Sequence, residues 1–270
     1  MRSIERARPL LGTIVAVRAE GHGDPASAVE AAFAAVARVE RRMSAYREDG
    51  DLAAVARLRA GERAAVDPLT ARCLWLALAL ARASEGVFDP VVATARRGGG
   101  AGGQAGPCWR DVALGRGGVT VRRALRLDLG GVAKGFAVDR AVAALRRAGV
   151  ASGAVDAGGD LRLFGADDWV ALAPSHAAPP AAIRLGDGAL ASSDVAAATA
   201  DRGAPQHRHP ATGTALAPGF ASVAASRCAV ADALTKIVLA RGAAAAPLLA
   251  RLGARGFLHR PGGDWQEIAA

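Results

Sequence analysis

The stretch LDLGGVAKGFAVD, from Leu127 to Asp139, decides the fold expected around it. Its alternating apolar residues predict a strand that ends at Asp128, and the apolar spacing from Val132 to Arg147 predicts a helix. Two glycines between them let the backbone approach another group closely. Lys134 falls in the first helical turn, where amides and an ammonium group suit a phosphate or diphosphate. The alternative is a tight strand-to-helix turn with a solvated lysine.

Two further segments gain weight beside the first. In VDAGGDLRLFG (155–165) paired glycines again precede an acid, which alone indicates a β-turn or bulge. In CAVADALTKIVLARG (228–242) helical spacing puts Asp232, Thr235 and Lys236 on one face. A carboxylate beside a hydroxyl suits Mg²⁺ better than zinc. The alternative is an aspartate that interacts with its own helix and pairs with the lysine four residues on.

The remaining pattern mixes helices and strands without a βαβ repeat, which predicts an α+β fold. Asp-Pro pairs at 24–25 and 67–68 are typical helix starts, and Gly86 is expected to stop the second helix. The other expected elements are a strand at 10–17, paired strands over 119–129, and helices over 228–241 and 243–252.

Composition excludes few classes of function. The 270 residues carry a net charge of +9, which favours anionic partners, but the aromatic content of 4% argues against a base-stacking nucleic-acid surface. Three distant cysteines predict buried thiols rather than disulfides or a metal site. We expect no membrane span, because no uncharged apolar run of about 20 residues occurs. No signal peptide is visible, so we expect the cytoplasm.

A glycine-dense segment, RRGGGAGGQAGP, covers approximately residues 97–107 and predicts a flexible loop. It lacks the lysine and hydroxyl residue of a phosphate-binding P-loop. The whole chain, residues 1–270, is expected to form one domain or two intimate lobes, with this loop on its surface. In this aromatic-poor chain, Tyr46 and Phe88 each follow a predicted helix, and either is a core aromatic or packs on a ligand ring.

Taken together and in order, these motifs resemble the ApbE-like FAD:protein FMN transferase family over nearly the whole chain. The motifs that carry the resemblance are RPLLGT, MSAYREDGDL, GVFDPVVA, LDLGGVAKGFAVD, DAGGDLRLFG, HPATG and ADALTK. The resemblance implies an ApbE-like, T-fold-related α+β architecture with an extended FAD groove. It also implies transfer of FMN from FAD to a threonine of an acceptor flavoprotein, with release of AMP and with Mg²⁺ on the diphosphate.

By the same resemblance, Asp232 and Lys134 serve catalysis, and the carbonyl of Gly131, Asp232 and Thr235 hold the metal. The residues expected to contact FAD are Leu11, where the family usually has methionine, Tyr46, Val87, Phe88, Asp89, Asp128, Lys134 and Arg208. Mg²⁺ and Lys134 would neutralise the charge that develops on the diphosphate.

The chain departs from the family pattern at two places. The family commonly has a metal-binding threonine four residues after the aspartate, but here Lys236 holds that position and Thr235 comes one residue earlier. Either Thr235 substitutes, or the Lys236 ammonium replaces part of the metal charge. In HRHPATG, the family histidine falls at Gln206 and His209 replaces an aspartate, so His207 is expected to act as the base.

Two alternatives follow from these departures. One is a metal-dependent hydrolase that splits FAD into FMN and AMP, with water in place of the threonine hydroxyl. The other is a non-catalytic FAD-binding protein. A basic nucleic-acid-binding protein is a third alternative, which the scattered arginines do not favour.

Overall fold

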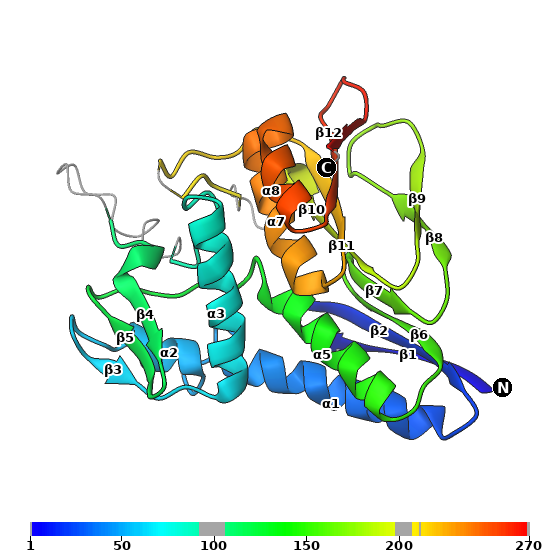
Figure 1. Ribbon diagram of the computed structural model, residues 1–270, viewed down its shortest axis with the longest axis horizontal. Coiled ribbons are helices and arrows are strands. Elements are labelled where there is room, and N and C mark those ends of the chain that lie inside the picture. Colours follow the sequence, from blue (N-terminus) through cyan, green and yellow to red (C-terminus); the bar gives the residue numbers. More distant parts are fainter. Residues whose placement is uncertain (1, 92–105, 198–206, 211, 269–270) are drawn as a thin grey trace.

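The computed structural model describes residues 2–91, 106–197, 207–210 and 212–268, and it has a mixed α and β architecture (Figure 1). Most of the glycine-rich segment 97–107, together with Gln206 and Ala211, lies outside these residues. A large sheet carries helices on one face and a hairpin on the other. A smaller sheet lies beside α3, on the far side of the helices from the large sheet (Figure 1).

The large sheet has eight strands, and every neighbouring pair is antiparallel. In spatial order its strands are β1 (Arg2–Leu10), β2 (Thr13–Gly21), β6 (Ser152–Ala157), β7 (Asp160–Phe164), β10 (Ala189–Asp194), β11 (Phe220–Ala225), β12 (Arg255–His259) and β13 (Gln266–Ile268). The smaller sheets are formed by β3 (Arg63–Ala64), β5 (Gly118–Val121) and β4 (Val112–Gly115), and by β8 (Asp168–Leu172) with β9 (Ala181–Leu185).

The helices begin where the sequence offers capping groups. Asp24 and Asp67 each accept backbone amides ahead of a proline, as predicted, and Gly86 closes the second helix with a bond to Ala81 O. The helices are α1 (Pro25–Met43), α2 (Asp51–Ala56), α3 (Pro68–Ala83), α5 (Ala133–Arg147), α7 (Cys228–Arg241) and α8 (Ala246–Arg251), with 3₁₀ turns η1 (Trp109–Asp111) and η2 (Gly242–Ala245).

Two cores fill the space on the two faces of the large sheet. The larger core packs α1, α5 and α7 against one face, extends to α3 beside α1, and includes Phe33, Leu74, Phe136 and Leu234. The smaller core lies under the β8–β9 hairpin. Cys73 and Cys228 are buried in the larger core, Cys108 is half-buried, and all three thiols are free.

The expected strand over 10–17 is wrong, because the chain reverses inside it. Leu10 ends β1 and Thr13 begins β2, and the two strands pair in register. The reversal puts both Leu11 (φ 58°) and Gly12 (φ 71°) in the left-handed region, which a two-residue hairpin turn requires. Leucine rarely adopts this conformation, so Leu11 did not indicate a turn at this position.

The expected paired strands over 119–129 are also displaced. The pairing joins β4 to β5 at 112–121, and the chain from 122 to 130 has no regular structure. Asp128 therefore ends no strand. Its amide donates to Pro90 O (2.7 Å), and its Oδ1 accepts the amide of Gly130 (2.9 Å). The second late helix is shorter than expected, because residues 242–245 form η2 before α8 begins.

The crossing of α5 and α7 is unusually close, and Gly135 makes it possible. A Cβ at this glycine would lie 2.6 Å from the carbonyl carbon of Cys228 and 2.8 Å from the amide nitrogen of Ala229. One turn later the Asp139 carboxylate accepts the amides of Cys228 (3.0 Å) and Ala229 (3.1 Å), and it also pairs with Arg162. Asp139 thus satisfies the otherwise open amides at the start of α7.

One helical stretch, Cys228–Arg251, is long and apolar enough to cross a membrane by length and composition, which the expectation of no span did not foresee. It comprises α7, η2 and α8, and half of its most apolar window is buried inside this fold. Helix α7 contacts β10, β11 and α5. The core helix of a folded domain passes the same test, so the stretch is weak support for a span.

Candidate functional site

The turn at Gly130–Gly131 and helix α7 converge at one place. The amide of Gly135 donates to Asp232 Oδ2 (3.3 Å), which joins the start of α5 to the first turns of α7. A Cβ on Gly131 would lie 3.4 Å from Cε of Lys236 and 3.1 Å from the Phe88 ring. Segments far apart in the sequence therefore bring together the residues that the two sharpest motifs contain.

Two ion pairs form the centre of this site. Lys134 Nζ donates to Asp160 Oδ2 (2.8 Å), and Lys236 Nζ donates to Asp232 Oδ1. The carboxylate side chains are completely buried, whereas those of Lys134 and Lys236 keep 30% and 23% of their surface exposed. The site therefore places two partly exposed lysine side chains beside two buried carboxylates, and the positive charge of the lysines suits an anionic ligand.

Burial and charge change the protonation of the two carboxyl groups in opposite directions. Burial, together with the negative charge of Asp232, raises the pKa of Asp160 to about 7 despite the neighbouring Lys134. Burial also acts to raise the pKa of Asp232, but the charges of Lys236 and Lys134 outweigh it and hold that pKa below its usual range. The carboxylates oppose the desolvation of Lys134 and raise its pKa. Both Asp232 and Lys134 are consequently charged at neutral pH.

The Thr235 hydroxyl bonds to groups other than the Asp232 carboxylate. It donates to the carbonyl of Asp232 (2.7 Å) and bonds to Ser193 Oγ on β10 (2.7 Å), and the residue is fully buried. Thr235 stays next to Asp232 on α7, but its hydroxyl is used by the Asp232 carbonyl and by Ser193. Of Thr235 and Lys236, Lys236 is the one whose side chain pairs with the Asp232 carboxylate.

The family model of the ApbE family matches residues 11–257 of this chain. The chain belongs to the ApbE family. A search of curated proteins found no match.

Solved structures of similar proteins agree with this placement in the ApbE family. The chain is similar to an ApbE protein from Thermotoga maritima (22% identity, 98% of this chain and 96% of the other, TM-score 0.84). It is also similar to the apo flavinyl transferase ApbE of Pseudomonas stutzeri (20%, 98% and 94%, 0.82) and to the flavin transferase ApbE of Vibrio cholerae (20%, 98% and 96%, 0.82). At these identities the likeness establishes the fold, and the predicted ApbE-like α+β class is confirmed.

Several residues expected to contact FAD in an ApbE protein lie at the edge of the charged centre. Phe88 is buried against Gly131, and Asp128 holds the same turn through its bond to Gly130. Asp89 uses both carboxylate oxygens on backbone amides, those of Val91 (2.8 Å) and Trp109 (3.2 Å). Burial raises the pKa of Asp89. The side chain of Asp89 thus holds the 87–91 segment, consistent with an expected contact through the backbone of Val87 to Asp89.

Leu11 and Tyr46 belong to segments that come before the charged centre in the sequence. Leu11 occupies the β1–β2 turn, where its amide donates to Glu40 Oε1 (2.8 Å). The turn adjoins the Gly158–Gly159 turn ahead of Asp160, because a Cβ on Gly158 would lie 3.1 Å from Cβ of Thr13. Tyr46 is 81% exposed, so it is not a core aromatic.

His207 and Arg208 belong to a short loop after the undescribed segment. The carbonyl of His207 accepts the amide of Leu216 (2.9 Å), and the Arg208 guanidinium donates to Gly213 O (2.8 Å). His209 bonds to Thr214 through its backbone. These bonds join described residues on either side of Ala211, and the loop precedes β11 in the chain.

The sequence did not single out three residues that the site uses. Asp160 was part of a quoted motif, but only the hairpin of β6 and β7 shows that it reaches Lys134. Ser193 accompanies Thr235, and Asp139 caps α7. For Asp160 the repeated pattern of two glycines before an acid was a usable signal. For Ser193 the sequence carried none.

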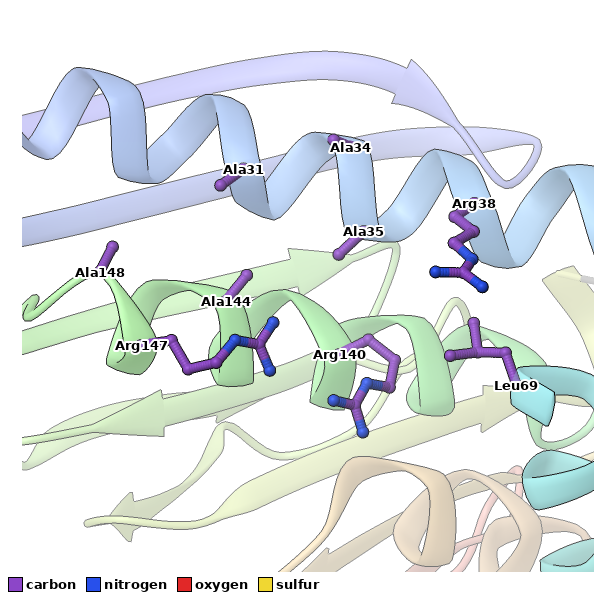
Figure 2. Close-up of a pocket in the computed structure, with 9 residues that line it drawn as sticks. All are labelled: Ala31, Ala34, Ala35, Arg38, Leu69, Arg140, Ala144, Arg147 and Ala148. Atoms are coloured by element: carbon purple, nitrogen blue, oxygen red, sulfur yellow. The ribbon is translucent and has the colours of Figure 1, made fainter.

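A separate groove of approximately 570 Å³ lies between α1 and α5. Figure 2 shows its floor of small alanine side chains and the arginines Arg38, Arg140 and Arg147 around it. None of the residues predicted to bind FAD or metal lines this groove. It is therefore distinct from the charged centre formed by Lys134, Asp160, Asp232 and Lys236.

Proposed function

We propose that this chain transfers the FMN part of FAD to an acceptor protein. The observation that carries the proposal is the pair of partly exposed lysine side chains, Lys134 and Lys236, each bonded to a buried carboxylate, Asp160 or Asp232. A diphosphate carries the complementary charge, and the adjacent Gly130–Gly131 turn has no side chains to keep it away. Membership of the ApbE family and the named transferases among its structural neighbours support the same activity.

The proposed acceptor group is a threonine hydroxyl of a flavoprotein. Its oxygen forms a bond to the FMN-side phosphorus, the bond from that phosphorus to the bridging oxygen breaks, and AMP leaves with the electron pair. The hydroxyl proton passes to a base, for which His207 is the proposed residue. Lys134 and Lys236 stabilise the charge that develops on the diphosphate oxygens, which is the main source of acceleration in phosphoryl transfer.

The rest of FAD is proposed to extend from this centre in both directions. Phe88, Asp128 and the backbone of Val87 to Asp89 lie beside Gly131 and are proposed to bind the nucleotide. The exposed Tyr46 ring offers an aromatic face, and Leu11 and Arg208 complete the proposed set of contacts. Together they define the proposed extended groove.

The residues expected to hold Mg²⁺ do not fit that ion in their present arrangement. Mg²⁺ requires oxygen ligands in nearly octahedral geometry. Asp232 already accepts Lys236 on Oδ1 and Gly135 on Oδ2, and the Thr235 hydroxyl is used by Ser193 and by the carbonyl of Asp232. Among the described residues, no cluster of three or more histidine, cysteine, aspartate or glutamate residues is placed to hold a metal. No step of the proposed reaction is therefore assigned to a metal.

The test is incubation of the full chain with FAD and a flavoprotein fragment that carries a threonine. Mass spectrometry is expected to show covalent FMN on the fragment, and free AMP is expected in equal amount. Lys134→Met should abolish the adduct, whereas Arg184→Met, which removes an exposed cation from β9, should leave it unchanged. Free FMN and AMP without an adduct would instead indicate hydrolysis. FAD that stays intact on the protein would indicate a binding protein.

A further inference from the structure

Lys236 occupies the space between two groups that were expected to hold a metal. Its ammonium pairs with the Asp232 carboxylate, and its Cε lies 3.4 Å from where a Cβ on Gly131 would be. A divalent ion bound to the Asp232 carboxylate beside Gly131 would compete with this ammonium group. The position of positive charge expected from the metal is thus already filled by a residue of the chain.

Lysine is rare in this chain, which uses arginine for most of its positive charges. Lysine and arginine together number 34, and only Lys134 and Lys236 are lysines. Both lie at the charged centre, one beside each buried carboxylate. A lysine ammonium is a compact point charge, whereas a guanidinium is a broad planar group that spreads its charge over a fork of donors. The space between Gly131 and Asp232 therefore suits lysine in a chain that uses arginine elsewhere.

The net charge of the centre depends on Lys236. With both aspartates ionised, Lys134 alone would leave the group with a net negative charge, which would repel a diphosphate. Lys236 brings the group to neutrality and removes this repulsion. The lysine side chains are partly exposed whereas the carboxylates are completely buried, so the lysines are the members that an approaching anion can reach.

We infer that Lys236 takes the place of a divalent cation in this chain, so that FAD binds through Lys236 and Lys134 without a metal. The inference rests on the proposed FAD site and deepens it. It assigns Lys236 as a direct contact of the diphosphate, and it assigns Thr235 a structural bond to β10 instead of a metal contact.

The test measures FAD binding by fluorescence quenching of the flavin, in EDTA and in Mg²⁺, separately from FMN transfer. For the wild type we expect nearly equal affinities in the two buffers. Lys236→Thr, which places a hydroxyl four residues after Asp232, should bind FAD at least about tenfold more weakly in EDTA and recover affinity in Mg²⁺. Lys236→Met should lose the same affinity without recovery, because it offers no oxygen ligand.

A second readout uses the scarcity of lysine. Reductive methylation with ¹³C-formaldehyde keeps the positive charge and labels only Lys134, Lys236 and the N-terminal amine. FAD added in EDTA should shift both lysine signals in the NMR spectrum, and Mg²⁺ alone should shift neither. Thermal unfolding of each variant verifies its fold, and if Lys236→Thr fails to fold, the labelled wild type still decides the question.

Three results would overturn the inference. One is wild-type FAD binding that improves tenfold or more when Mg²⁺ replaces EDTA. Another is a folded Lys236→Thr variant that binds FAD in EDTA as tightly as the wild type. In both cases FMN transfer still tests the proposed function separately. If the wild type binds FAD neither in EDTA nor in Mg²⁺, the proposed function is overturned, and the role of Lys236 with it.

Discussion

Gly135→Ala tests whether the close crossing of α5 and α7 builds the charged centre. The added methyl carbon would lie 2.6 Å from the carbonyl carbon of Cys228 and 2.8 Å from the amide nitrogen of Ala229. Both are backbone atoms, so no side-chain rotation relieves the contact. The two helices have to separate by roughly 0.9 Å to reach a van der Waals distance of about 3.5 Å.

The structure sets the size of the expected loss. Overpacking of this kind costs about 1–3 kcal/mol, and the better helix propensity of alanine returns up to about 1 kcal/mol. Separation also lengthens the bonds from Asp139 to the amides of Cys228 and Ala229, now 3.0 and 3.1 Å. Hydrogen bonds to a charged group contribute about 1.5–3 kcal/mol each, so we expect a net loss of roughly 2–4 kcal/mol.

The assay is thermal unfolding followed by circular dichroism, where this loss corresponds to a Tm lower by roughly 4–16 °C. FAD binding should weaken as well, because the Gly135 amide no longer holds Asp232 in place. Gly23→Ala is the matched control, since it adds the same methyl group where no atom lies within 4 Å. A Gly135→Ala variant as stable as Gly23→Ala would show that the helices tolerate separation and that the reasoning is wrong.

Three further perturbations address the buried polar groups. Asp139→Ala should lower the free energy of unfolding by about 3–5 kcal/mol in urea titrations, because it strips a buried pair, whereas Asp187→Ala, at an exposed pair, should cost at most about 1 kcal/mol. Burial raises the pKa of Asp160 from its ordinary value of 3.8 to about 7, so its folded state binds the proton more tightly. The stability it contributes should therefore be present below about pH 4 and fall as the pH rises toward 7, and Asp160→Asn should remove that decline in denaturation curves recorded across this range. Thr235→Val should cost about 1–3 kcal/mol by leaving Ser193 without its partner, and it should not alter the effect of Mg²⁺ on FAD binding; a changed Mg²⁺ response would restore Thr235 as a metal contact.

The helices were predictable because their signals are local. Asp24-Pro25 and Asp67-Pro68 supply a capping carboxylate and a proline in adjacent positions, and both helices begin there. The apolar spacing after Val132 placed α5 within one residue of its start. Such patterns depend on residues within a turn or two of each other, so tertiary packing has little opportunity to override them.

The turn between β1 and β2 and the irregular segment 122–130 could not be predicted from such local patterns. Apolar residues on both sides of the turn, among them Leu10, Leu11 and Ile14, predicted one continuous strand. The turn was missed because Leu11 adopts a backbone conformation that its side chain disfavours. Leu125 and Leu127 are buried and alternate like strand residues, yet their segment makes no ladder. An apolar alternation reports burial, and the choice between a strand and an extended loop depends on partners that lie elsewhere in the chain.

Around Asp232, a difference of one position on helix α7 determines which side chain pairs with the carboxylate. Thr235 and Lys236 follow each other on α7 and point about 100° apart, so they cannot both face the same ligand equally. Sequence spacing permitted either to join Asp232. The antiparallel pairing of β10 with β11 places Ser193 under α7 and gives the Thr235 hydroxyl a partner there, while the side-chain-free Gly131 leaves room for Lys236 on the other side. The long-range register therefore assigns the hydroxyl to the sheet and the ammonium to the site, which is why a lysine in the position of a metal-binding threonine is compatible with an intact fold.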